Sequence, residues 1–176
     1  MHVGTVYHRA IQQIAEQGLS QWDGARVAGC APLYRALLRQ LGVPEAELDV
    51  AAALVQQALV NTLEDDRGRW ILSADHGEVH NEFALTGLYH GRPVNAIIDR
   101  TFVDADGTRW IIDYKTSRHE GGDREAFMRQ ELERYAEPLA RYRSLLSTLH
   151  PEPVQAALYY PLLRGWITLS GDSIRI

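Results

Sequence analysis

The sequence predicts one α/β domain over residues 1–176, with a mixed central β-sheet and helices on its flanks. Three observations predict this class. The first ~65 residues show helical periodicity. The middle of the chain holds extended segments rich in Ile, Val, Thr, Phe and Trp, punctuated by Gly and Asp. A long amphipathic pattern over 124–149 then predicts a helix, and further extended segments follow it.

The composition is that of a globular protein. The chain has 176 residues, of which 45% are hydrophobic and 23% charged, which argues against disorder or a fibrous repeat. The single cysteine, Cys30, excludes an internal disulfide framework and a multi-cysteine zinc site. No apolar run can span a bilayer and no basic-then-apolar segment begins the chain, so we expect a cytoplasmic protein with no membrane partner. The net charge of −5 does not indicate a nucleic-acid partner.

Three helices are expected in the N-terminal part. The first covers 3–17 and places His8 on the same face as apolar residues. The second covers 31–41, and the third begins at the favoured first-turn position of Pro44 and continues through Leu63. The cluster of Asp and Gly at 65–68 predicts a turn.

The middle and the end of the chain are expected to form the sheet. Strands are predicted at 69–73, 77–86, 93–103, 108–114, 154–160 and 166–170. A three-residue hairpin loop is expected at 105–107, with Gly107 in the left-handed conformation. Residues 118–123 form a polar break before the helix at 124–149, which Pro138 should kink or split.

The chemistry-bearing residues are on two neighbouring predicted strands. If residue 104 pairs with 108 across the hairpin, the same register sets Asp99 opposite Asp113, with Cβ atoms ~5 Å apart. Asp113 and Lys115 are two residues apart and therefore point to one face of the strand. Lys115 is also the only lysine in the chain, whose other 17 basic residues are arginines.

Two close carboxylates repel each other unless one is protonated or a cation lies between them. Carboxylate oxygens suit Mg²⁺ or Mn²⁺, and such an ion can activate water for phosphodiester hydrolysis. A nearby lysine can orient that water or neutralise charge in the transition state. The alternative is a solvated, salt-bridged strand face without a metal.

These residues resemble the PD-(D/E)XK nuclease superfamily, specifically the RecB/AddA-type exonuclease domain of helicase–nucleases. Asp99 and the run Asp113-Tyr114-Lys115-Thr116 are similar to the core of that family. Gly4-Thr5-Val6-Tyr7-His8 is similar to its Gly-Thr-x-x-His element, and Asn81-Glu82-Phe83 to its acidic strand. The motifs keep their order over nearly the whole chain.

The resemblance implies a role for each matching residue. His8, Asp99, Asp113 and the backbone carbonyl of Tyr114 would hold Mg²⁺, for which Mn²⁺ would substitute. Lys115 would be the catalytic lysine. Glu82 would lie at the edge of the site as a second-metal or outer ligand, although Glu78 shares its strand parity and is an alternative.

The resemblance also implies DNA, in single-stranded form, as the partner. Tyr142 would lie near the strand, and Thr116 and Arg118 are further candidates for DNA contact. The implied fold is a restriction-endonuclease-like core over 66–176, with a helical part over 1–65 that carries the histidine. The sequence departs from the family at Ala96, where glycine is expected, and at Pro138, where glutamine is expected.

The expected function is that of the exonuclease module of a helicase–nuclease in DNA recombination and repair. The helicase domain or subunit would lie upstream, so the chain is either a stand-alone nuclease or an excised domain. One alternative is a weak or inactive nuclease-fold domain that serves DNA binding or complex assembly. Another is a nuclease of the same chemistry that acts on RNA.

Overall fold

The computed structural model describes residues 2–119, 121–170 and 174–175. It divides into two compact units. The helical unit comprises Met1–Ala74, Lys115–Arg118 and Tyr160–Arg164. The sheet unit comprises Asp75–Tyr114, His119–Tyr159 and Gly165–Ile176. The segment that follows the third strand therefore belongs to the helical unit, although the strand itself belongs to the sheet unit.

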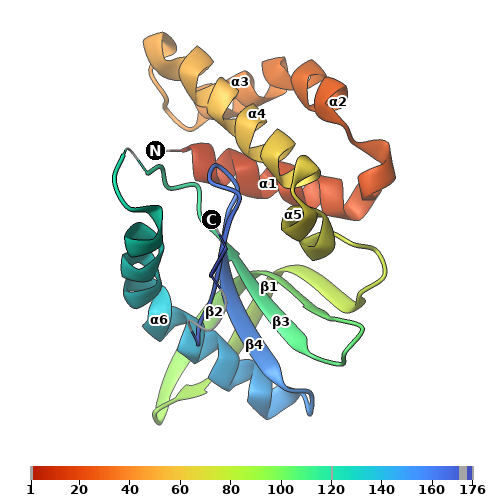
Figure 1. Cartoon of the computed structure of the whole chain (residues 1–176), viewed down its shortest axis with the longest axis vertical. Helices are drawn as coiled ribbons and strands as arrows, with labels where there is room; N and C mark the ends of the chain where they lie inside the picture. The colour runs from red at the N-terminus through yellow and green to blue at the C-terminus, as the bar shows by residue number, and fades with distance from the viewer. Residues whose placement is uncertain (1, 120, 171–173, 176) are drawn as a thin grey trace. The chain divides into compact units, whose positions relative to one another are not determined.

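The helical unit is built around α4, which packs against α1, α2, α3 and α5 (Figure 1). Its helices are α1 (Val3–Gln17), α2 (Gly24–Gly29), α3 (Ala31–Gln40), α4 (Leu48–Glu64) and α5 (Asp66–Ile71), with two 3₁₀ turns, η1 (Leu19–Gln21) and η2 (Glu45–Glu47). The apolar face of α1 is buried, as its periodicity predicts. The hydroxyls of Tyr7 and Thr62 lie 3.0 Å apart in a buried hydrogen bond between α1 and α4.

The sequence predictions for this unit need four corrections. The strand at 69–73 and the turn at 65–68 are wrong, because α5 occupies Asp66–Ile71. Asp65 caps that helix by accepting a hydrogen bond from the Gly68 N–H at 3.2 Å. The short helix α2 was not predicted, and the third helix begins at Leu48 after the turn η2 rather than at Pro44.

The sheet unit contains a six-stranded sheet over the described residues, in the order β1-β2-β3-β4-β5-β6. The strands are β1 (Gly77–Tyr89), β2 (Arg92–Val103), β3 (Arg109–Tyr114), β4 (Val154–Tyr160), β5 (Gly165–Thr168) and β6 (Ile174–Arg175). β1, β2 and β3 are successively antiparallel, and β3 and β4 are parallel. The predicted mixed sheet is therefore confirmed, and β6 is an addition to it.

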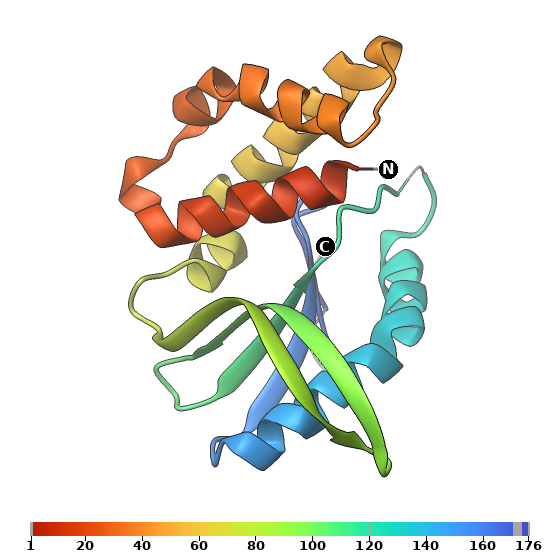
Figure 2. The same ribbon diagram turned by 180° about the vertical axis from the view of Figure 1, so that it is seen from behind.

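One helix, α6 (Arg124–Leu149), connects β3 to β4 and covers one face of the sheet. A Cβ atom at Gly87 of β1 would lie 2.7 Å from Cδ2 of Leu145, so glycine permits the close approach of helix and strand. Pro138 does not split the helix. Instead α6 changes direction along its length, as Figures 1 and 2 show, which is the bend expected of an internal proline.

The register determines which residues lie on the opposite face from α6. Gly87, on the α6 side, shares strand parity with Leu85, which pairs with Ala96 of β2, and both are buried. Strand residues alternate between faces. Asp99 is odd-numbered, whereas the residues of β2 on the α6 side are even-numbered, so Asp99 lies on the face that α6 does not cover.

Candidate active site

The hairpin between β2 and β3 has the predicted register. The N–H of Asp104 donates to the carbonyl of Thr108 at 2.9 Å, and Gly107 has φ +77° in the loop. The ladder runs from the pair of Val103 and Arg109 to the pair of Arg100 and Ile112. Extending this register by one residue on each strand sets Asp99 opposite Asp113. Both side chains are half-buried and lie on the face opposite α6.

Asp99 also holds the end of β3. Its Oδ2 accepts a hydrogen bond from the backbone N–H of Tyr114 at 2.8 Å. This bond limits the rotation of the carboxylate and ties the last residue of β3 to β2. Asp99 therefore combines a structural role with its position in the acidic cluster.

Glu82 is a carboxylate on the strand next to Asp99, and we call Glu82, Asp99 and Asp113 the acidic cluster because the register sets them side by side on three adjacent strands. Its neighbours in β1 pair with Arg100 and Ile98, which places Glu82 beside Asp99, and an oxygen of each carboxylate lies within 4.8 Å of the other. Glu82 is exposed and has φ +47°, a left-handed conformation that is uncommon for a residue with a side chain. Glu78 has nearly the same φ, +46°, so this conformation marks irregular points of β1 and does not distinguish the two glutamates.

Glu78, the alternative to Glu82, has a different environment. Its Oε2 accepts a hydrogen bond from Nη2 of Arg109 at 2.7 Å, and Arg109 is fully buried. Glu78 also lies with His150 and Glu152, whose ligand atoms are all within 4.8 Å of one another. Since the Arg109 guanidinium already supplies the positive charge there, this second cluster is an ion-pair network around a buried arginine. Sequence analysis did not single out Arg109.

The other face of the strands carries a buried cation. Nη1 of Arg100 donates to Oδ1 of Asn81 at 2.7 Å, and burial lowers the pKa of the Arg100 guanidinium. Burial raises the pKa of the Tyr114 hydroxyl, and the charge of Asp99 adds to this effect. Tyr114 is thus a protonated, buried anchor for the end of β3, and Asp113 and Lys115 flank it along the chain.

The segment after β3 packs within the helical unit. A Cβ atom at Gly4 of α1 would lie 3.1 Å from Oγ1 of Thr116. The glycine of the Gly-Thr element therefore lets the first turn of α1 approach the residues that follow Tyr114. Lys115 and Thr116 are half-buried, and Arg118 is exposed.

The remaining predicted residues lie on helices. His8 is half-buried on α1, with its ring 6.1 Å from that of Tyr7. Tyr142 is half-buried on α6. Among the described helices, none is long and apolar enough to cross a membrane.

The donor set of the acidic cluster suits a hard divalent cation. Glu82, Asp99 and Asp113 present carboxylate oxygens from three adjacent strands, the donor chemistry that Mg²⁺ and Mn²⁺ prefer. Without a cation, the proximity of Glu82 and Asp99 brings repulsion between like charges. Bound Mg²⁺ keeps several waters and needs only one or two carboxylates, so this cluster meets the requirement.

Comparison with known proteins finds a family that matches most of the chain. A family model described as the PD-(D/E)XK nuclease superfamily matches residues 2–165, which is most of the chain. The match includes every element from α1 to β4, and with them the three carboxylates and Lys115. Among curated proteins, none matches the chain.

Proposed function

The chain belongs to the PD-(D/E)XK nuclease superfamily, and we propose that it is a Mg²⁺-dependent nuclease that hydrolyses phosphodiester bonds of single-stranded DNA. The observation that carries the proposal is the row of Glu82, Asp99 and Asp113 across β1, β2 and β3, with the only lysine two residues after Asp113. Aspartates on two neighbouring strands followed by a lysine are also the sequence features that resemble the core of the superfamily.

In this proposal Asp99 and Asp113 hold the metal, with the backbone carbonyl of Tyr114 and the imidazole of His8 as further ligands. Glu82 is an outer or second-metal ligand, which agrees with its exposed position beside Asp99. When bound, a divalent ion acidifies water and offsets negative charge on the phosphate. The hydrogen bond from Tyr114 to Asp99 keeps one carboxylate in a fixed orientation.

Lys115 is the proposed catalytic residue. Its ammonium donates hydrogen bonds to the attacking water or to a non-bridging phosphate oxygen, where charge increases in the transition state. The water oxygen bonds to phosphorus, the phosphorus–oxygen bond to the leaving sugar breaks, and a proton passes to the leaving oxygen. The absence of a side chain at Gly4 leaves room for Thr116, the residue next to this lysine, since a Cβ there would lie 3.1 Å from Thr116 Oγ1.

The finer assignments follow from the resemblance to RecB/AddA-type domains. We propose exonuclease action, and a helicase domain or subunit as the partner that supplies the single strand. Thr116, Arg118 and Tyr142 are the proposed DNA contacts. Arg118 is exposed and close in sequence to Lys115, which suits a phosphate contact.

The test is digestion of a labelled single-stranded DNA with Mg²⁺ or Mn²⁺ by the wild type and by Lys115→Ala. We expect metal-dependent cleavage that falls at least ~100-fold in the variant, the usual effect of losing a proton-transfer or charge-stabilising group. Equal cleavage by both proteins would remove Lys115 from the mechanism. A matched RNA strand in parallel tests the preference for DNA.

Metal binding separates an active nuclease from a domain that only keeps the fold. Mn²⁺ should raise the Tm of the wild type and of Lys115→Ala, because the lysine is not a ligand, but not that of Asp113→Ala. No Mn²⁺ response and no cleavage in the wild type would favour a DNA-binding or assembly domain.

A further inference from the structure

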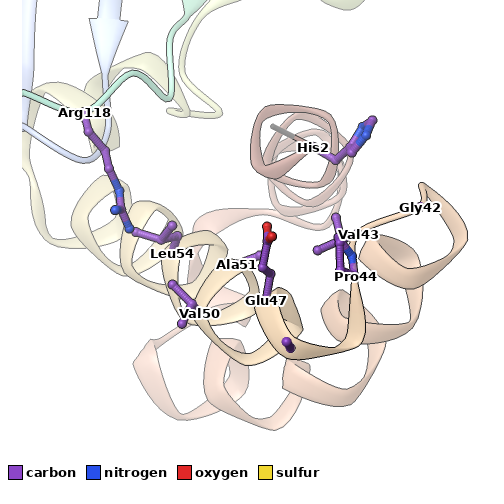
Figure 3. A pocket seen from close by; sticks show the side chains of 10 residues that line it. His2, Gly42, Val43, Pro44, Glu47, Val50, Ala51, Leu54 and Arg118 are labelled. Atoms are coloured by element: carbon purple, nitrogen blue, oxygen red, sulfur yellow. The ribbon is translucent and has the colours of Figure 1, made fainter.

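The helical unit contains a pocket of about 400 Å³ that the acidic cluster does not use. Its lining includes Val43, Glu47, Val50, Ala51, Leu54 and Arg118. Figure 3 shows Arg118 extending from the segment after β3 toward Leu54 of α4. Sequence analysis did not find this pocket, because its walls come from separate parts of the chain: His2, the segment before α4, α4 itself and Arg118.

The walls of the pocket are mainly apolar, and its polar groups are few. Val43 and Ala51 form buried parts of the wall, whereas Val50 is 62% exposed at its surface. Arg118 supplies a guanidinium and Glu47 a carboxylate. Pockets of ~300–1,000 Å³ with apolar walls and a few placed polar groups are typical of sites for small molecules.

The polar groups match the chemistry of a nucleotide. A guanidinium pairs with phosphate through two parallel hydrogen bonds. A carboxylate accepts a hydrogen bond from the exocyclic amino group of a base, as Asp and Glu do with cytosine. The apolar walls fit the faces of a base that has left its stack.

Arg118 also connects the pocket to the proposed catalytic segment. It follows Lys115 by three residues, so their Cα atoms are at most ~11 Å apart, because each extended residue adds at most ~3.6 Å. Stacked bases on one strand rise ~3.4 Å each, so this separation corresponds to at most about three nucleotides. A strand held at Lys115 can therefore place a nearby nucleotide at Arg118.

We propose that this pocket is a base-binding subsite for the single strand that the nuclease cleaves. One unstacked base enters between Val43, Val50 and Leu54, and Arg118 pairs with the adjoining phosphate. Glu47 accepts a hydrogen bond from the amino group of the base, which favours cytosine, adenine and guanine over thymine, the base without such a group. The substrate assignment rests on the proposed nuclease function.

The test measures binding of fluorescent single-stranded oligonucleotides in EDTA, where no cleavage takes place. Val50→Glu places a charge at the apolar wall and should weaken binding about tenfold. Leu33→Glu is the matched control, since Leu33 is 50% exposed on α3 and does not line the pocket. Arg118→Gln should also weaken binding and reduce its salt dependence, and Arg92→Gln at the β1–β2 hairpin is the control of equal charge.

A series of oligonucleotides, each with one abasic position, gives a readout that misfolding does not imitate. Wild type should lose affinity at one position of the series, counted from the bound end, and Val50→Glu should not. A flat series for the wild type, or equal binding by Val50→Glu and Leu33→Glu, would overturn the subsite. If affinity depends on the abasic position but Mn²⁺ gives no cleavage, the subsite is kept and the nuclease activity is rejected. If Mn²⁺ gives cleavage but affinity is the same at every abasic position, the nuclease activity is kept and the subsite is rejected.

Discussion

Two variants of Asp99 can separate its structural role, the hydrogen bond to the end of β3, from its proposed role as a metal ligand. Its Oδ2 accepts the Tyr114 N–H at 2.8 Å, and its charge lies within 4.8 Å of that of Glu82. Asp99→Asn keeps an acceptor oxygen and removes the charge. Asp99→Ala removes both. The difference in stability between the two variants therefore measures the hydrogen bond.

The magnitudes follow from the structure. A hydrogen bond contributes ~1.5–3 kcal/mol when the acceptor is charged and ~0.5–1.5 kcal/mol when it is a neutral amide, whereas alanine leaves the N–H of Tyr114 without this acceptor at a cost of ~1–3 kcal/mol. Repulsion between two unit charges at that separation is ~1 kcal/mol in water, the relevant limit because Glu82 is exposed. In EDTA, Asp99→Asn weakens the hydrogen bond by ~1 kcal/mol and removes ~1 kcal/mol of repulsion, so its stability should match that of the wild type within ~1 kcal/mol. Asp99→Ala should be ~2 kcal/mol less stable than Asp99→Asn, because it leaves the N–H without this acceptor.

The assay is thermal unfolding in EDTA and in excess Mn²⁺. For a chain of this length ~1 kcal/mol corresponds to ~2–4 °C, so the two variants should differ by ~4–8 °C in EDTA. Mn²⁺ at about 100 times its Kd should stabilise the wild type by ~2.7 kcal/mol and neither variant by a comparable amount. Equal Tm values for the two variants in EDTA would refute the strand-holding role. A wild-type Mn²⁺ shift in Asp99→Asn would refute the metal-holding role.

Two further predictions concern glycines at close contacts. Gly4→Ala should lower cleavage several-fold with little change in Tm, because the new Cβ would lie 3.1 Å from Thr116 Oγ1 beside Lys115. In a Thr116→Ala background, Gly4→Ala should cause almost no further loss of cleavage. A loss of equal size in that background would contradict the contact. Gly87→Ala should destabilise the protein by ~1–3 kcal/mol in denaturant unfolding, since its Cβ would lie 2.7 Å from Leu145 Cδ2. That cost should disappear in a Leu145→Ala background, and its persistence would point to the strand backbone instead.

The arrangement of the two aspartates could be predicted because local geometry determines it. A three-residue loop with a left-handed Gly107 fixes the pairing of 104 with 108, and the ladder then carries that register to Asp99 and Asp113. The order of the strands around them also follows from the sequence, because antiparallel neighbours need only short turns. The parallel partner β4 follows from the long crossover that α6 provides.

The choice between Glu78 and Glu82 could not be made from strand parity. The pairing of β1 with β2 shifts between Gly77 and His80, and both glutamates have positive φ. In an irregular strand the alternation of faces no longer identifies which side chain meets Asp99. What separates the two is the buried Arg109, which binds Glu78 and comes from β3. That interaction joins residues 31 apart in sequence and has no local signal.

The errors in helix prediction have a related cause. Trp70 and Ile71 favour extended structure on their own, but the cap at Asp65 and the burial of Ile71 stabilise α5. Pro138 costs ~3 kcal/mol in a helix interior, yet α6 continues through it because Leu139, Leu145 and Leu146 are buried beyond that point. In both places packing outweighs the local preference.

Pro138 also affects the proposed DNA contact on α6. The residue stands four positions before Tyr142, where the resemblance expects a glutamine, and Pro138 can offer neither that amide nor its own N–H. Because α6 remains continuous, the substitution removes a side chain without removing the helix that carries Tyr142. Under the proposed function, the missing amide on α6 would make DNA affinity depend more on the segment after β3. Arg118 and the pocket that it lines belong to that segment, and they are independent of α6.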